Sequence, residues 1–150
     1  MKLKVILLSI FALLIAQTTF AQTKAKAKST ANKTEQVAQH RVVYDVVSAD
    51  SAQQGKIMKH LEKMLNHWPD AQLEMVVHGK GLDMLVKGKA TAAEQLKVLQ
   101  DKGVKFVACE NAMRAHNVQK EQLLPGVLTV PMGVVEIIEK QEEGYSYIKL

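Results

Sequence analysis

From residue 41 onward, the sequence alternates between short β-branched segments and segments with the apolar periodicity of a helix. The strand-like segments are 41–48, 71–79, 104–109, 126–131 and 145–150. The helix-like segments are 51–68, 91–103, 112–116 and 132–144. This alternation, with short connections, predicts a parallel sheet between helix layers. The expected fold class is α/β, a three-layer α/β/α sandwich with a mainly parallel five-stranded sheet.

Local residue choices mark where the helices begin and end. Asp50 or Ser51 is suited to cap the first helix, and Pro69 ends it. Thr91 and Glu94 have the spacing of a capping box at the start of the second helix. The first strand-like segment, "RVVYDVVS", is nearly continuous in apolar character, so we expect it to be covered on both faces.

The last segment, "YSYIKL", alternates apolar and polar residues, which is typical of a strand at the edge of a sheet. We expect Tyr145, Tyr147 and Ile148 to leave apolar surface there for a neighbouring subunit to cover. The sequence therefore favours a homo-oligomer.

The first residues have the three regions of a secretory signal peptide. Lys2 and Lys4 form a basic start, an apolar stretch covers 5–16, and small residues lead to Ala21. We expect residues 1–21 to be removed and the protein to be exported, to a periplasmic or extracellular location. The apolar stretch is shorter than the roughly 18 to 20 residues of a membrane-spanning helix, and no comparable stretch follows, so no membrane span is expected.

The charge of the chain is concentrated in its first part. Residues 22–39 form a polar, lysine-rich segment that we expect to be a flexible linker, followed by one folded domain at 40–150. The net charge is +5 overall, but from His40 onward 14 Lys and Arg residues face 14 Asp and Glu residues. The domain lacks the basic stripe that nucleic-acid binding needs, so we expect no nucleic-acid partner.

The candidate site residues follow the strands. In a parallel α/β sheet, ligands bind at the carboxyl ends of the strands, where the strand-to-helix loops gather. The polar or soft side chains predicted at that edge are Asp50, His78, Cys109, Asn111 and Met132. We expect Cys109 and His78 to carry chemistry, and Asp50, Asn111 and Met132 to contact a ligand.

Cys109 is the only cysteine of the chain, so it cannot form an internal disulfide. It stands where a strand-like segment meets a helix-like one. A thiol at a helix N-terminus meets unpaired N–H groups that favour thiolate, and a neighbouring His78 would do the same, whereas Glu110 would oppose it. Free cysteines are also among the most buried residues, so an inert core Cys109 is the other interpretation.

Other chemistry has little support in the sequence. The segment "GKGLDML" lacks the glycine spacing of GxGxxG and the Lys-Ser/Thr pair of a P-loop, so nucleotide binding is not predicted. The only plausible metal ligands are Cys109, His78 and His116, too few for a convincing site. We predict no metal and no cofactor.

The domain resembles the DsrE family of small sulfur-handling proteins. The resemblance runs from Arg41 to Leu150 and rests on "VVHGKGLDML", "VKFVACENAMRAHNV" and "LLPGVLTVPMGVVEIIEKQEEGYSYIKL", in that order. It implies a three-layer α/β/α fold that assembles into trimers or hexamers. In the cytoplasmic sulfur-relay members, a cysteine at the position matched by Cys109 accepts sulfur as a persulfide and passes it on.

An exported relative would need other donor and acceptor proteins than those cytoplasmic relays use. The preferred hypothesis is an exported DsrE-like protein that carries sulfane sulfur, or another thiol-reactive species, on Cys109. Two alternatives remain open: an oligomeric small-ligand-binding or scaffold module with a structural cysteine, and a thiol redox sensor. Turnover of a substrate, as in a sulfurtransferase, is left open by the sequence.

Overall fold

The computed structural model describes residues 40–48 and 50–150. The predicted signal peptide and linker, 1–21 and 22–39, lie outside the described residues. Within the described part, no helix combines the length and apolar character needed to cross a bilayer.

The sheet has five strands, all parallel, in the order β4-β3-β2-β1-β5. In chain order these are β1 (Arg41–Val46), β2 (Gln72–Val77), β3 (Lys105–Cys109), β4 (Leu128–Val130) and β5 (Ser146–Lys149). The predicted α/β sandwich is confirmed, and β5 lies at an edge of the sheet as its alternating sequence indicates.

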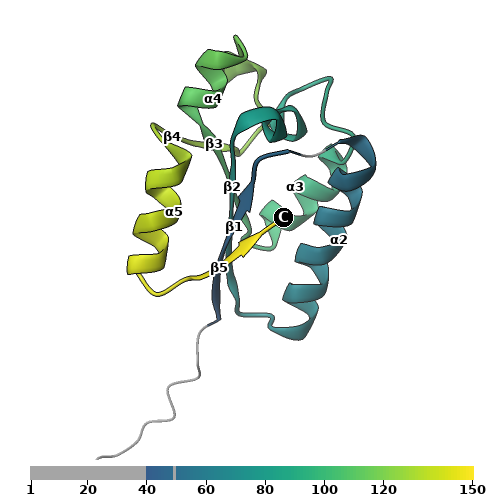
Figure 1. Cartoon of the computed structure of the whole chain (residues 1–150). Coiled ribbons are helices and arrows are strands. Elements are labelled where there is room, and N and C mark those ends of the chain that lie inside the picture. The colour runs from purple at the N-terminus through teal and green to yellow at the C-terminus, as the bar shows by residue number, and fades with distance from the viewer. Residues whose placement is uncertain (1–39, 49) are drawn as a thin grey trace, which may run out of the picture. The chain divides into compact units, whose positions relative to one another are not determined.

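Helices cover the two faces of the sheet unequally. On one side lie α2 (Ser51–His67) and α3 (Ala93–Asp101), and on the other lies α5 (Gly133–Glu142) (Figure 1). The short helix α4 (Glu110–Ala115) follows β3 at the end of the sheet where the strands finish. Two 3-10 segments, η1 (Gly79–Leu85) and η2 (Lys120–Gln122), complete the connections. Sequence patterns did not indicate the turn at η1.

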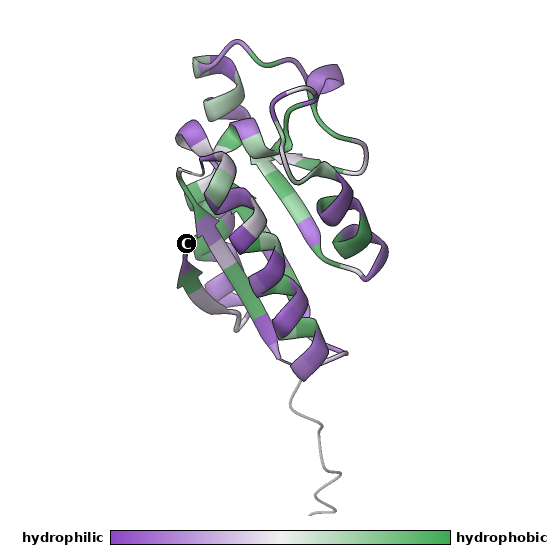
Figure 2. Cartoon of the chain, turned by 90° about the vertical axis from the view of Figure 1, so that its right-hand side faces the viewer, coloured by the Kyte–Doolittle hydropathy of each residue, from purple (hydrophilic) through white to green (hydrophobic). Residues whose placement is uncertain are grey.

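The main core lies between the sheet and the α2/α3 layer. Tyr44, Met75 and Phe106 are register partners on three adjacent strands, and all three are fully buried on this side. Burying side chains of this size stabilises the fold by roughly 1.5 to 3 kcal/mol each. Figure 2 views the domain from this side, with hydrophilic residues along the outer surface of α2 and hydrophobic residues in the strands behind it.

The face of the sheet toward α5 has a smaller apolar core than the other face and carries more polar side chains. Val43, Val76 and Val107 form its apolar centre with Ile137 of α5. Because side chains alternate between faces along a strand, Asp45 and Glu74 share this face with those valines. β1 is buried along almost its whole length, which confirms the expected cover on both faces, and Asp45 is its one buried charged residue.

Two helix starts differ from prediction. The capping box predicted for α3 does not form, because Thr91 Oγ1 donates instead to the Ser51 carbonyl at 3.2 Å and to Gln54 Oε1 at 3.0 Å. α4 begins earlier than the predicted 112–116, with Cys109 itself as the capping residue. Pro69 follows the end of α2 as expected, and Gly103 follows the end of α3.

Candidate functional site

His78 and Cys109 occupy neighbouring positions at the carboxyl ends of adjacent strands. Val77 of β2 pairs with Ala108 of β3. His78 is the residue after Val77, and Cys109 is the residue after Ala108. His78 continues β2 in an extended conformation, and its N–H donates to the Val46 carbonyl at 2.9 Å. The sheet register therefore places the two side chains on adjacent strands, on the face that α5 covers.

Gly133, the first residue of α5, approaches this pair closely. A Cβ atom at Gly133 would lie 3.3 Å from Cys109 Cβ, 3.6 Å from His78 Cβ and 3.1 Å from Val76 Cγ1. The close approach allows the Gly133 N–H to donate to Cys109 Sγ, with N and S 3.2 Å apart. An N–H in the first turn of a ten-residue helix favours negative charge on the atom that it faces.

A cavity of about 310 Å³ opens at this point of the sheet edge. Four of the five predicted site residues line it: His78, Cys109, Asn111 and Met132. Asp50 does not; it caps α2, where its Oδ1 accepts the Gln53 N–H at 2.7 Å. The capping role that the sequence indicated for Asp50 is therefore confirmed, and Asp50 lies outside the cavity that the other four residues line.

The remaining lining residues are mostly small or apolar, and they come from η1, α4 and α5. They are Gly79, Ala112, Ala115, His116, Gly133 and Val134. Asn111 does not cap α4, since its Oδ1 accepts a hydrogen bond from Arg114 one turn later. Its side chain thus contributes to the wall of the cavity rather than to the cap of α4.

Cys109 is 6% exposed and its sulfur has a hydrogen-bond donor. Glu110, the expected opponent of a thiolate, does not line the Cys109 cavity but a separate one with Arg114 and Lys120. The carboxylate next in sequence is therefore not among the groups that face the thiol cavity.

A hydrogen-bonded chain of three side chains reaches His78 from the β5 edge. Asp45 Oδ1 lies 2.7 Å from His78 Nε2, and Asp45 Oδ2 accepts from the Tyr147 hydroxyl at 2.8 Å. This bond to Asp45 raises the pKa of Tyr147. Sequence reasoning missed Asp45, although a lone carboxylate inside an apolar strand is a recognisable signal.

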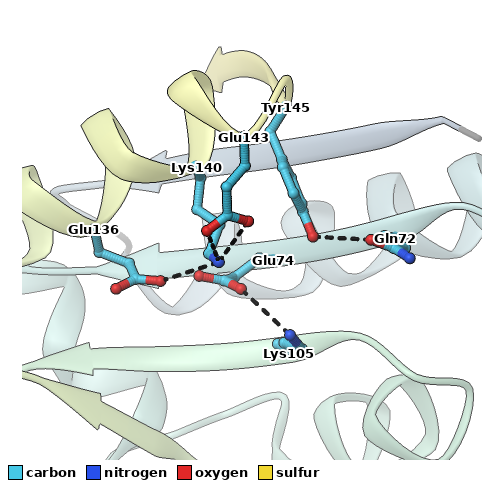
Figure 3. Close-up of polar contacts among 7 residues, drawn as sticks. All are labelled: Gln72, Glu74, Lys105, Glu136, Lys140, Glu143 and Tyr145. Atoms are coloured by element: carbon cyan, nitrogen blue, oxygen red, sulfur yellow. Dashed lines mark hydrogen bonds and ion pairs between the residues drawn. The ribbon is translucent and has the colours of Figure 1, made fainter.

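A second polar cluster lies beneath α5, around the buried carboxyl of Glu74 (Figure 3). Glu74 Oε2 is 3.9 Å from Lys105 Nζ, while Lys140 of α5 lies 3.7 Å from Glu136 and 3.0 Å from Glu143. Burial first, and then the neighbouring Glu136 carboxyl, raise the pKa of Glu74 to about 7. Helix α5, which begins with Gly133 beside the thiol, therefore packs over the titratable carboxyl of Glu74.

Across residues 40–48 and 50–150, no three His, Cys, Asp or Glu side chains are grouped so as to hold a metal ion. The cavity walls offer one thiol and two imidazoles, from Cys109, His78 and His116. This arrangement suits nucleophilic chemistry on sulfur. The Cys109 sulfur accepts a hydrogen bond from the Gly133 N–H, and His78, bonded to the buried Asp45, lies on the adjacent strand.

The outer surface on the α5 side of the domain is unusually apolar. Met132, Val134, Val135 and Ile138 are each at least 41% exposed, and Leu128 of β4 is 50% exposed. On β5, Tyr147 is exposed but Tyr145 is buried, with its hydroxyl donating to Gln72 Oε1 at 3.0 Å. The expectation that Tyr145 contributes apolar surface is therefore wrong.

Comparison with known proteins places this fold in a family. The model of the DsrE/DsrF-like family matches residues 41–150. The structure is similar to MTH1491 from Methanobacterium thermoautotrophicum, described as a protein of unknown function, with a TM-score of 0.71 and 27% identity over 75% of this chain and 100% of that chain. The ychN protein from E. coli shares the fold, with a TM-score of 0.62 and 12% identity over 75% of this chain and 99% of that one.

A search of curated protein sequences gave no match. The family match covers all five strands, and so both residues at the centre of the site, Cys109 and His78. The chain therefore belongs to the DsrE/DsrF-like family.

Proposed function

We propose that the protein is an exported sulfur carrier that holds sulfane sulfur on Cys109 as a persulfide. Membership of the DsrE/DsrF-like family suggests a function of the sulfur-relay type. The single observation that carries the proposal is the hydrogen bond from the Gly133 N–H to Cys109 Sγ, in a cavity that His78 also lines. A thiol used only for packing needs neither the donor nor the cavity.

The loading step is a thiol exchange on sulfur. The Cys109 thiolate attacks the outer sulfur of a donor persulfide R–S–SH, and a new S–S bond forms on the protein. The S–S bond of the donor breaks, and the electron pair leaves with R–S⁻, so Cys109 becomes Cys–S–SH and no external oxidant is needed. Attack by an acceptor thiolate on the same outer sulfur reverses the step and returns Cys109 to a thiolate.

Each part of the cavity has a task in this step. The Gly133 N–H stabilises negative charge on the Cys109 sulfur, and His78 takes up and returns the proton. Asn111 and Met132 line the space that an incoming sulfur compound enters. The cavity, at about 310 Å³, suits a small sulfur compound or the tip of a partner's side chain.

The partners of the carrier are proposed from the export prediction and from the exposed apolar surface. A donor and an acceptor protein outside the cytoplasm would supply and receive the sulfur. The exposed side chains of α5, Val134, Val135 and Ile138, favour burial against another copy of the chain, as a trimer or hexamer.

The burial of Cys109 favours one alternative over the other. A buried sulfur beside a largely apolar cavity is also what a small-ligand-binding module with a structural cysteine would have. A redox sensor must bring two Cys109 residues from different copies to a Cα separation of roughly 4.4 to 6.8 Å, which a cysteine only 6% exposed opposes.

The test compares the chain with its Cys109→Ser variant after treatment with inorganic polysulfide. Mature protein is treated, freed of reagent and weighed intact by mass spectrometry with and without reductant. We expect a reductant-labile gain of sulfur in the unsubstituted protein and none in C109S. In parallel, iodoacetamide should label Cys109 in the folded protein.

The binding-module alternative gives a different pattern. Cys109 would then resist both polysulfide and iodoacetamide in the folded state and react only after denaturation. That result would remove the sulfur-carrier proposal.

A further inference from the structure

Four polar or nucleophilic side chains lie on one diagonal across four adjacent strands, from β5 to the end of β3. Asp45 pairs with Val76 in the β1–β2 register, and His78 lies two residues beyond Val76, on the same face. Tyr147 pairs with Val43, two residues before Asp45, again on that face. Cys109 lies directly across from His78, because Val77 pairs with Ala108, and it ends this line of side chains. The line ends at the cavity that holds the thiol.

Asp45 is 7% exposed, and its two oxygens are both used, by His78 and by Tyr147. A buried carboxylate is costly unless hydrogen bonds compensate for its lost hydration. An ionised carboxylate only accepts, so both bonds are donated to it, by Tyr147 O–H and by His78 Nε2–H. In the neutral ring the proton therefore stays on Nε2, and Nδ1 is the nitrogen with a free lone pair.

We propose that Asp45 is a positioning residue, which fixes His78 with Nδ1 as the base that serves Cys109, and that Tyr147 holds Asp45 in place. This inference rests on the proposed thiol chemistry of Cys109, and it deepens that proposal by assigning the proton path. Tyr147, 43% exposed, connects the path to the edge strand β5.

The proton balance of the step is complete within these residues. The S–H proton of Cys109 moves to Nδ1 of His78, directly or through one water, and the sulfur keeps the electron pair with which it attacks the donor sulfur. The imidazolium that results keeps its Nε2–H on Asp45, where the bond becomes charge-assisted and stronger. When the persulfide is passed on, Nδ1 returns the proton to Cys109.

The other charged or titratable groups near this diagonal are few. His116 lines the same cavity from the end of α4, Lys149 is the register partner of Asp45 on β5, and Glu74 lies on the same face as Asp45, as the register partner of Val43 on β2. His116 lines the thiol cavity itself, so it cannot serve as a neutral control. The control for His78→Gln is His67→Gln, at an exposed histidine of α2 outside the cavity lining.

The test measures the rate of Cys109 alkylation by iodoacetamide from about pH 6 to about pH 10, a range that spans the titration of an ordinary thiol. An amide at position 45 is able to donate to Nε2, which favours the opposite tautomer and removes the lone pair from Nδ1. We expect Asp45→Asn to slow the reaction about tenfold or more near neutral pH. The rates should converge at high pH, where the thiol ionises without help.

A double-mutant cycle separates positioning from a merely structural role. His78→Gln alone should slow alkylation as much as D45N, and D45N should have no further effect in the H78Q background. Tyr147→Phe changes an exposed side chain. It should slow alkylation less than D45N does, with the same loss of the effect at high pH. Asp101→Asn, at an exposed carboxylate paired with Lys97, and H67Q should leave the profile unchanged.

Three results would overturn the inference: a D45N profile that matches the unsubstituted protein, a slowing that is equal at all pH values, or a slowing that persists in the H78Q background. If D45N does not fold, Y147F and H78Q carry the same test. The alkylation cycle requires no sulfur donor, so it succeeds or fails independently of polysulfide loading. If polysulfide loads Cys109 normally but D45N and H78Q do not change the alkylation rate, the proton path is rejected and the proposed carrier function is not.

Discussion

The buried carboxyl of Glu74 predicts an unusual dependence of stability on pH. Its side chain is 3% exposed, Lys105 Nζ lies 3.9 Å from its Oε2, and its pKa is raised to about 7 from an ordinary 4.5. The folded state therefore binds this proton more tightly than the unfolded state. Stability from this group is fully present below about pH 4.5 and is lost as pH rises to about 7.

The shift sets the size of the effect. At about 1.4 kcal/mol per pKa unit, the difference between about 7 and 4.5 corresponds to at most about 3 to 4 kcal/mol of unfolding free energy. Glu74→Gln keeps the shape of the protonated acid but cannot ionise. We expect E74Q to be about as stable as the unsubstituted protein near pH 5, and more stable by up to about 3 to 4 kcal/mol near pH 8.

Urea unfolding at fixed protein concentration, followed by the fluorescence of the single Trp68, measures this difference at each pH. Glu139→Gln, on the exposed side of α5, is the matched control and should track the unsubstituted protein. If the stability difference between E74Q and the unsubstituted protein is the same near pH 5 and near pH 8, Glu74 does not titrate in this range. The reasoning from burial would then be wrong.

Three further predictions follow from other parts of the domain. Gly133→Ala should cost about 1 to 3 kcal/mol in urea unfolding and slow Cys109 labelling, because its Cβ would lie 3.1 Å from Val76 Cγ1; an unchanged variant would refute the close approach. Light scattering should give a trimer or larger, and Ile138→Asp on the exposed side of α5 should shift the mass toward monomer; a clean monomer before substitution would contradict this. N-terminal sequencing of the exported protein should begin at Gln22, within a residue or two, whereas only full-length protein inside the cell would contradict export.

Local sequence patterns are enough to predict the α/β class, because each strand and helix of this domain carries its own periodicity. The alternation in "YSYIKL" also identified the edge strand, since only an edge position tolerates such exposure. Local patterns gave a wrong prediction where a side chain suited to helix capping makes a hydrogen bond to a distant part of the chain instead. Thr91 looks like a helix cap, but in the fold its hydroxyl has Ser51 and Gln54 of α2 within reach.

The candidate site was predictable in part, for a physical reason. His78, Cys109, Asn111 and Met132 each lie at or just after the end of a strand, so parallel topology alone brings them to one end of the sheet. Asp45 and Tyr147 lie within strands, and their contact depends on β5 taking its place beside β1. That order brings the last strand of the chain next to the first, which no local pattern specifies.

Asp50 has the helix-capping role that its local sequence indicated. The cavity forms over β2, β3 and the start of α5, and Asp50 does not line it. Glu110 is adjacent to Cys109 in sequence but lines a different cavity. Sequence proximity to the thiol is thus a poor guide to what surrounds it.

The most direct test of the carrier proposal is whether Cys109 gives up sulfur as well as taking it. Protein loaded with polysulfide and freed of reagent is mixed with glutathione, and both partners are followed by mass spectrometry. The account predicts that the protein loses its added sulfur, that glutathione persulfide appears in equal amount, and that C109S produces none. Absence of loading, or conversion of Cys109 to a disulfide between two chains with no persulfide released, would contradict it.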